Sequence, residues 1–341
     1  MVLVTGGTGL VGSHLLYFLL KENETVRAIH RENSDLESVK RVFGYYASEA
    51  ADLFDRIEWI EANIIDIPAL SEAFQDITHV YHCAAYISFD PAHYRKLKKA
   101  NVEGTANIVN LCLSHGIKKL AYVSSVATLG DAVNGKMISE DTHWNPEGEN
   151  SVYAITKFGA EMEVWRGTQE GLNAVIVNPG VILGSGYWNS GSGSIIKTAS
   201  KGIPFYFGGG IGIVDVKDVV RILLQLMKEE ITGQRYVLVS ANVSYKKLLS
   251  AIANNAGKSP PKKEAPKWIL YFLSGLDWLA AVLFGSKRRL LKATVRSMYT
   301  DTAYDASKIR NELKYKFIRF EDTIERVVKN YSSEVSSGSV S

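Results

Sequence analysis

Thr5-Gly6-Gly7-Thr8-Gly9-Leu10-Val11-Gly12 decides the fold of this chain, and it directly follows the apolar run Val2–Val4. The apolar run predicts a buried parallel strand, and the leucine-rich segment His14–Leu20 predicts a helix. Glycine permits positive φ and close approach of the backbone to a pyrophosphate, and a helix N-terminus offers free N–H groups to an anion. Gly7, Gly9 and Gly12 have dinucleotide-binding spacing. We therefore predict a dinucleotide site here rather than an ordinary glycine-rich loop.

The end of the next strand, residues 25–31, indicates which dinucleotide is bound. His30 and Arg31 stand about twenty residues after the glycines, where an acidic residue would hold the ribose hydroxyls, and Glu32 comes only afterwards. A guanidinium pairs well with a phosphate. We therefore predict NADP(H), with NAD(H) less favoured. The alternative is that Arg31 is a solvated surface charge.

Composition limits the class of protein. The chain has 341 residues with 46% hydrophobic and 22% charged content, which is typical of a globular protein with a good core. A net charge of +3 is too small to indicate nucleic-acid binding, and we predict no metal site. Cys83 and Cys112 make no disulfide framework and fit a reducing compartment. Because the first strand starts at the N-terminus and leaves no room for a signal peptide, we expect a cytoplasmic protein.

The first half of the chain alternates strands with helices. This alternation predicts an α/β fold with a Rossmann-type, doubly wound parallel sheet. We expect residues 1–183 to form the NADP(H)-binding Rossmann domain, with residues 213–240 returning to it. Residues 184–212 and 241–331 would form a smaller, mainly helical substrate-binding region. The Ser-rich tail, residues 332–341, is predicted to be disordered.

The segment Trp268–Phe284 is strongly apolar, with Lys267 before it and a Lys-Arg-Arg run at 287–289 after it. At about seventeen residues it is at the lower limit for a membrane span, and Asp277 in its middle would be costly there. We favour a helix that covers an apolar substrate pocket. Contact with a membrane surface is the second interpretation.

Ser125, Tyr153 and Lys157 are the candidate catalytic residues. Tyr-x-x-x-Lys alone is weak evidence, because it occurs at Tyr17/Lys21, Tyr94/Lys98, Tyr153/Lys157 and Tyr304/Lys308. Only Tyr153 opens a long predicted helix, residues 151–168, after a strand that ends at Ser125, and ligands bind at such strand ends. Lys157, one turn on, would lower the pKa of Tyr153, with an oxidised nicotinamide assisting, and Ser125 would orient the substrate oxygen. The alternative interpretation is that Tyr153 and Lys157 are residues of a helix surface and that Ser125 caps the end of a strand.

The sequence resembles the extended short-chain dehydrogenase/reductase family, also called the NAD-dependent epimerase/dehydratase superfamily, over about residues 1–330. The glycine turn and the Ser-Tyr-Lys set both match. The further segments that match are Val80–Ala85, Asn101–Asn107, Asn178–Gly184 and Val214–Val219. The resemblance implies a dimer built from the helices at 100–113 and 151–168.

The family also implies which residues hold the cofactor. Its usual aspartate after the third strand is replaced by Asn63, whose carbonyl can still accept the adenine hydrogen bond. The full predicted set is Gly6, Gly7, Thr8, Gly9, Leu10, Val11, Gly12, His30, Arg31, Asn63, Ile64, Ala84, Ala85, Asn101, Tyr153, Lys157, Asn178, Pro179, Gly180 and Val181.

Two subfamilies suggest the reaction. The end of the second strand resembles dihydroflavonol 4-reductase and cinnamoyl-CoA reductase, and the C-terminal segment resembles 3β-hydroxysteroid dehydrogenase-like members. By analogy we expect an NADP(H)-dependent oxidoreductase that interconverts a carbonyl and a secondary alcohol on an apolar small molecule. The expected pocket walls, which could equally be core, are Ala85–Phe89, Leu183–Trp188, Phe205–Phe207 and Trp268–Phe284.

Two other functions stay open. An NAD-dependent nucleotide-sugar epimerase or dehydratase would use the same triad, with Arg235 and Arg296 as candidate cations for the sugar diphosphate. A nucleotide-sensing or scaffold protein would be expected to have lost Tyr153 or Lys157, and both are present.

Overall fold

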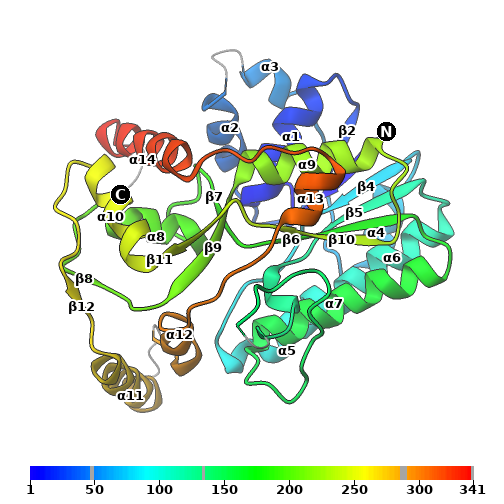
Figure 1. Ribbon diagram of the computed structural model, residues 1–341. Coiled ribbons are helices and arrows are strands. Elements are labelled where there is room, and N and C mark those ends of the chain that lie inside the picture. Colours follow the sequence, from blue (N-terminus) through cyan, green and yellow to red (C-terminus); the bar gives the residue numbers. More distant parts are fainter. Residues whose placement is uncertain (47–49, 133–134, 285–289, 339–341) are drawn as a thin grey trace.

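Seven parallel strands form the central sheet, in the order β10-β6-β5-β4-β1-β2-β3. The computed structural model describes residues 1–46, 50–132, 135–284 and 290–338. The strands are β1 (Val2–Thr5), β2 (Val26–His30), β3 (Glu58–Glu61), β4 (His79–His82), β5 (Lys119–Val123), β6 (Ala174–Pro179) and β10 (Gln234–Leu238). Helices lie on both faces of this sheet (Figure 1), so the predicted α/β, Rossmann-type fold is confirmed.

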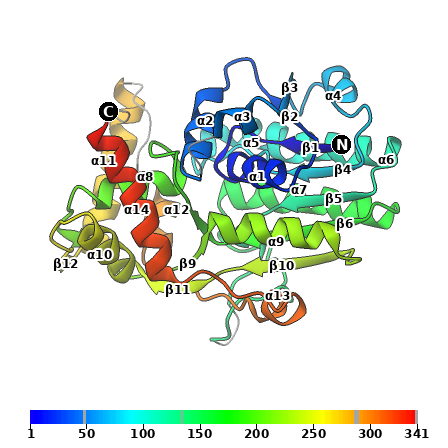
Figure 2. The same ribbon diagram turned by 90° about the horizontal axis from the view of Figure 1, so that it is seen from above.

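Two groups of helices cover the sheet (Figure 2). The group that packs around α1 consists of α1 (Leu10–Lys21), α2 (Leu36–Gly44), α3 (Ala50–Phe54) and α9 (Val216–Lys228). The elements outside that group are α4 (Ile67–Ala73), η1 (Pro91–His93), α5 (Tyr94–Leu97), the π-helix η2 (Lys98–Glu103), α6 (Gly104–Ser114), η3 (Val126–Thr128) and α7 (Val152–Gln169). Of these, α6 and α7 pack against each other.

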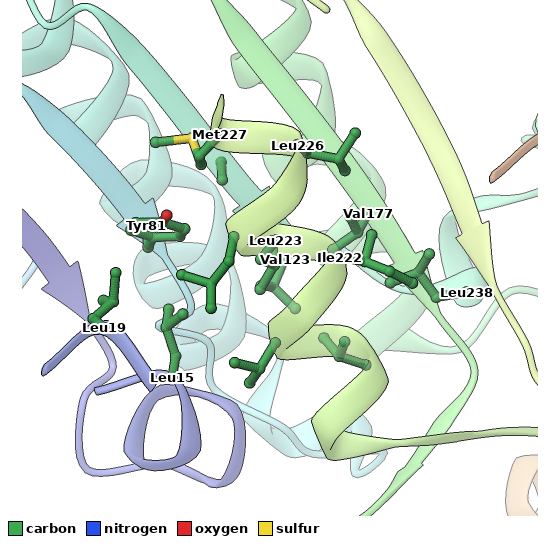
Figure 3. Close-up of a cluster of buried hydrophobic side chains, with 14 of the residues drawn as sticks. Leu15, Leu19, Tyr81, Val123, Val177, Ile222, Leu223, Leu226, Met227 and Leu238 are labelled. Carbon is green, nitrogen blue, oxygen red and sulfur yellow. The ribbon is translucent and has the colours of Figure 1, made fainter. Parts of the chain in front are cut away.

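Alternate side chains of each strand enter different cores, because successive residues of a strand point to opposite faces. On β1, Val2 and Val4 join the core under α1 and α9, whereas Leu3 joins the core under α4, α6 and α7. Figure 3 shows the first of these cores, with Leu15 of α1 and Leu223 of α9 among its side chains. Val123 of β5 and Val177 of β6 lie in the first core. Burial on both faces explains why these strands read as continuous apolar runs.

The second region contains strands as well as helices. Its strands are β7 (Val181–Leu183), β8 (Phe205–Tyr206), β9 (Gly210–Asp215), β11 (Ala241–Ser244) and β12 (Lys263–Glu264), and they form a sheet of order β11-β9-β7 and a β12-β8 pair. Its helices are α8 (Gly191–Ala199), α10 (Tyr245–Asn255), α11 (Lys267–Phe284), α12 (Lys292–Ser297) and α14 (Phe320–Ser336). Helix α13 (Ser307–Glu312) instead packs against β10, and its Ile309 enters a core of the central sheet. Among the described residues, no helix has both the length and the apolarity to cross a membrane.

Two sequence predictions are wrong. Strand β9 does not return to the Rossmann sheet with α9 and β10, because it pairs with β7 and β11. Residues 332–336 are not disordered, because α14 continues to Ser336. Phe320, Ile324 and Tyr331 recur on one face of that helix and enter the core of the second region. This amphipathic pattern outweighs the Ser-rich composition of the tail; residues 339–341 lie outside the described part.

Candidate active site

The glycine turn joins β1 to α1 and is packed too tightly for side chains. Gly6 has φ +70°, and a Cβ there would lie 2.6 Å from the backbone nitrogen of Ala84. A Cβ on Gly12 would lie 2.1 Å from the carbonyl oxygen of Gly6. Both positions therefore require glycine, Gly6 for its backbone conformation and Gly12 for the close contact between helix and turn.

The N-terminus of α1 is left open to an anion. Gly9 is the N-cap and supplies no side-chain cap, and the first turn, which contains Leu10 and Val11, carries no acidic residue. The first N–H groups of a helix need partners, and the helix dipole favours a negative charge there. The residues present therefore fit the pyrophosphate of a dinucleotide.

The end of β2 carries no acidic side chain. His30 is the last residue of the strand, and its Nδ1 lies 3.1 Å from the carbonyl oxygen of Arg31. Arg31 is exposed, and within the described residues its guanidinium forms no ion pair. After β3, Asn63 Oδ1 already accepts a hydrogen bond from the Ile65 N–H at 3.3 Å, and Ile64 is half-buried. Two cationic or donor groups thus stand where the ribose would be held.

Lys157 is buried inside α7, where its ammonium donates to the Tyr122 hydroxyl at 2.6 Å and to the Val123 carbonyl at 3.0 Å. These contacts attach α7 to β5, the strand that leads to Ser125. Burial lowers the pKa of Lys157 to about 7, and the nearby carboxylate of Glu161 opposes the shift. The charge of this lysine is therefore held in a water-poor position beside the strand end.

Tyr153 lies in the first turn of α7, and its side chain is close to that of Ser125, which follows β5. Ser151 caps the helix by accepting from the Ala154 N–H at 3.1 Å, which fixes the turn that carries Tyr153. Burial raises the pKa of Tyr153, and a hydrogen bond with the Ser125 side chain acts in the opposite direction. The expectation that Lys157, together with an oxidised nicotinamide, lowers the pKa of Tyr153 stays a prediction, because here the ammonium of Lys157 is bonded to Tyr122 and to the Val123 carbonyl.

Glu161, one turn beyond Lys157, is fully buried and accepts five hydrogen bonds. Its donors are Ser124 Oγ at 2.6 Å, Thr128 Oγ1 at 2.7 Å, Asn178 Nδ2 at 2.8 Å, Arg235 Nη1 at 3.0 Å and Trp165 Nε1 at 3.3 Å. The donors come from the ends of β5 and β6, from η3, from β10 and from α7 itself. Glu161 therefore connects the catalytic helix to three neighbouring strands or their ends.

Two asparagines in the predicted cofactor set are bonded within the protein. Asn101 lies in η2, accepts from the Tyr86 N–H at 2.7 Å and donates to Thr156 Oγ1 at 3.2 Å. Asn178 donates to the Ser125 carbonyl at 3.1 Å. The structure brings both beside the triad and gives their amides positioning contacts.

The remaining members of the predicted set lie at the carboxyl ends of β4 and β6. Ala84 donates its N–H to Thr5 Oγ1 at 3.3 Å, and Ala85 follows it. Pro179 ends β6 and Val181 begins β7, and a Cβ on Gly180 between them would lie 2.5 Å from the Gly212 carbonyl oxygen. Strand ends at this edge of an open α/β sheet form its ligand crevice.

An apolar groove lies beside Phe89, whose ring packs against the candidate catalytic residue Tyr153. The rings of Phe89 and Tyr153 are 5.4 Å apart. Phe89 also lines a groove of about 490 Å³ together with α11 and the start of α12. The lining residues are Phe89, Pro91, Gly275, Trp278, Leu291, Lys292 and Ala293. Two of the predicted walls, 85–89 and α11, therefore contribute to this groove.

The other two predicted walls lie elsewhere. Leu183 and Trp188 are buried in the core of the second region, and Phe207 packs against that core. Phe205 is exposed on β8, which pairs with β12. None of these residues lines the groove beside Phe89, so the core interpretation of 183–188 is the correct one.

Both cations proposed for a sugar diphosphate are already engaged. Arg235 pairs with the buried Glu161 at 3.0 Å and donates through Nε to the Glu140 carbonyl at 2.9 Å. Arg296 forms an ion pair with Glu149. A diphosphate would have to compete with these carboxylates for either guanidinium.

Sequence reasoning missed Tyr122, Glu161 and His82. His82 is buried between Thr5 and Thr105, and burial together with the charge of Lys157 lowers its pKa to about 3. Glu161 had a usable signal, because Tyr153, Lys157 and Glu161 recur at four-residue spacing on one face of a helix. Tyr122 lies within an apolar strand and gave no such signal.

A family comparison agrees with this geometry. Residues 2–238 match the model of the "NAD dependent epimerase/dehydratase family". The chain belongs to this family. Its members are enzymes of the oxidoreductase and epimerase types, and the matched residues contain the glycine turn and the triad.

Individual relatives support the resemblance noted in the sequence. The "Putative dihydroflavonol 4-reductase" of Synechocystis sp. is 29% identical over 318 residues, covering 91% of this chain and 88% of that protein. The "3beta-hydroxysteroid-dehydrogenase/decarboxylase isoform 1" of Arabidopsis thaliana is 22% identical, covering 96% of this chain and 79% of that protein. The crystal structure of gox2253 is 27% identical, with a TM-score of 0.80 and 98% of each chain covered.

Proposed function

We propose that this protein is an NADP(H)-dependent reductase or dehydrogenase that interconverts a carbonyl and a secondary alcohol on an apolar small molecule. The observation that carries the proposal is an apolar groove lined by Phe89, whose ring packs against that of Tyr153. An apolar ligand gains free energy from burial in such a groove. The family contains both reductases and epimerases, so the groove rather than the family supports the choice of a reductase.

Each triad residue has a role that its contacts support. Tyr153 donates a proton to the carbonyl oxygen, and Ser125, which already bonds its hydroxyl, orients that oxygen. Lys157 places a cation at the end of β5, where its field stabilises negative charge on the reacting oxygen. NADPH, when bound, supplies the hydride. Glu161 acts at a distance by holding α7 and the strand ends in register.

The choice of NADP(H) rests on His30 and Arg31. A ribose 2′-phosphate needs donors and positive charge, whereas a free ribose diol is usually held by a carboxylate. Arg31 is exposed and unpaired among the described residues, so it is available to a phosphate. The proposal that the protein uses NADP(H) follows from that local charge.

A steady-state screen tests the proposal. The purified protein would be assayed with NADPH and with NADH against aromatic ketones and sterol ketones, following absorbance of the reduced cofactor. It would also be incubated with NAD⁺ and nucleotide sugars, and any epimerised product would be separated by chromatography. We expect turnover of an apolar ketone with NADPH and none of a nucleotide sugar. Saturable epimerisation of a nucleoside-diphosphate sugar, with no ketone reduction, would establish the epimerase alternative instead.

A further inference from the structure

Helix α11 exposes apolar side chains to a degree that a surface helix normally avoids. Trp268 is 71% exposed and Phe272 is 63% exposed. Four further large hydrophobic residues of the helix are also exposed, namely Leu273, Leu276, Trp278 and Leu279. Single exposed hydrophobic residues are ordinary, but a contiguous apolar patch marks an interaction surface. Figure 1 shows α11 at the periphery of the molecule, between β12 and α12.

The polar side chains in the middle of α11 face the protein. Ser274 is buried, and its hydroxyl donates to the Leu290 carbonyl at 2.8 Å. Asp277 Oδ2 accepts from the Leu290 N–H at 3.1 Å. The returning chain thus satisfies the hydroxyl and the carboxylate that would oppose contact with an apolar medium. What the helix presents outward is its apolar surface.

Cations lie on both sides of this apolar surface. Lys262, Lys263 and Lys267 precede or open α11, Lys292 follows it, and all four are exposed. The sequence adds a Lys-Arg-Arg run at 287–289, outside the described residues. An apolar helix with tryptophans and flanking cations is the pattern of segments that lie in the membrane interface, where lysines attract anionic headgroups.

We propose that α11 lies in the interfacial layer of an anionic phospholipid bilayer, with its apolar side chains among the acyl chains and its flanking lysines at the headgroups. A second copy of the chain fits this surface less well, because apposed α11 helices would bring their lysine clusters together. The same helix contributes Gly275 and Trp278 to the groove, so an apolar molecule dissolved in the bilayer would lie close to it.

Vesicle flotation tests this proposal in the absence of cofactor and substrate, so its outcome does not depend on the proposed reductase activity. Full-length protein would be mixed with vesicles of phosphatidylcholine alone or with added phosphatidylglycerol. We expect binding to the anionic vesicles at least about tenfold stronger than to the neutral ones. The double variant Trp268→Glu, Phe272→Glu should lose at least about tenfold of that binding.

A matched control changes two exposed hydrophobic residues outside α11, Ile67→Glu and Val335→Glu. This control adds the same negative charge as the α11 variant. If net charge alone determined vesicle binding, the two variants would therefore bind equally weakly. We expect instead that the control keeps most of its binding. Lys267→Gln with Lys292→Gln should reduce anionic preference by about fivefold for each charge removed.

Three outcomes would overturn the proposal. The first is a wild-type protein that stays in the unbound fraction with every vesicle. The second is an equal loss of binding in the α11 and control variants. The third is a lipid-free dimer, seen by light scattering, that the α11 variant converts to a monomer, since that result assigns the surface to a second copy. Melting temperature and NADP(H) affinity, measured on each variant, show that it is folded.

Discussion

Helices α7 and α11 are both eighteen residues long. Both depart from the usual pattern in which charged side chains are exposed and apolar ones are buried, but in opposite ways. α7 buries the charged residues Lys157 and Glu161, whereas α11 exposes Trp268 and Phe272. Each reversal opposes folding on its own, because buried charge and exposed apolar surface are both unfavourable. Such departures are expected at functional sites. For α7 we propose that this function is catalysis, and for α11 that it is contact with lipid.

The two reversals also differ in what compensates them. Glu161 receives five hydrogen bonds, one of them from a guanidinium, so its charge is stabilised inside the protein. The rings of Trp268 and Phe272 on α11 have no such compensation, because most of their surface is exposed. The buried charges of α7 are therefore compensated within the protein, whereas the exposed apolar surface of α11 would be buried only by contact with a partner, which we propose is the bilayer.

The largest expected effect tests whether α7 carries the chemistry. Tyr153→Phe should lower turnover by about two to four orders of magnitude while NADP(H) affinity is unchanged, because only the proton donor is lost. Turnover and cofactor titration measure the two quantities. Tyr94→Phe and Tyr304→Phe, from other Tyr-x-x-x-Lys segments, are the controls. If either control loses activity and Tyr153→Phe keeps it, the catalytic group is not on α7.

The second effect concerns the buried charge of α7. Glu161→Gln should lower the free energy of unfolding by about 3 kcal/mol, because Arg235 loses the partner that neutralises it. The control is Glu163→Gln on the same helix, whose pair with Arg166 is partly exposed and should change stability by less than about 1 kcal/mol. Urea unfolding measures both. Equal decreases in the free energy of unfolding would mean that the buried Glu161–Arg235 pair contributes no more to stability than the partly exposed Glu163–Arg166 pair.

Local patterns predicted the parts of the site that depend on neighbouring residues. The glycine turn, with Gly6 and Gly12, and the Tyr153/Lys157 pair follow from spacing within one turn or one helix. The Glu161 network could not be predicted in this way, because β10, β6 and β5 are adjacent in the sheet but distant in sequence. The contact between Lys157 and Tyr122 depends on that same strand order.

The C-terminal half shows a different limit of sequence reasoning. The apolarity of α11 was evident, but its exposure depends on how the second region packs, so a pocket cover was the favoured interpretation. The prediction that residues 85–89 and α11 form pocket walls is correct in part, since Phe89 and Trp278 both line the groove. The disorder prediction is wrong for residues 332–336 because their Ser-rich composition does not reveal that α14 continues beyond Tyr331 to Ser336.

The third effect is a pH dependence of stability from Lys157. Its pKa in the folded protein is about 7, below the ordinary value of 10.5, so between those values the unfolded chain binds more protons. The free energy of unfolding should therefore rise with pH above 7, by at most about 1.4 kcal/mol per pH unit. Urea unfolding at pH 7, 8 and 9 measures the slope. Lys157→Met should reduce it.

Two other lysines also contribute to the pH dependence of stability and must be allowed for in that experiment. Burial also lowers the pKa of Lys119 and of Lys217, so some slope should remain in Lys157→Met. A slope identical to that of the wild type would show that Lys157 is not the group that titrates, and that the charge on α7 is as well solvated as a surface charge.

The fourth effect tests the cofactor end of the sheet. NADP(H) should bind at least tenfold more tightly than NAD(H), about 1.4 kcal/mol, and Arg31→Ala should remove most of this preference. Arg56→Ala, at another exposed arginine, is the control and should leave the ratio unchanged. Fluorescence titrations with both cofactors measure the ratio. Equal wild-type affinities, or tighter NAD(H), would contradict the proposed 2′-phosphate site.

The smallest effect distinguishes an exposed ring from a buried one. Phe272→Ala should change the free energy of unfolding by less than about 0.5 kcal/mol in the absence of lipid, because the ring has little to lose. Phe43→Ala, the buried control that packs on Tyr17 and Phe54, should cost about 3–5 kcal/mol. Adding anionic vesicles should leave the Phe43 result unchanged and reveal the Phe272 substitution as weaker membrane binding. A lipid-free loss above about 2 kcal/mol for Phe272→Ala would mean that the ring is covered by protein, and α11 would then resemble α7 in being complete without a bilayer.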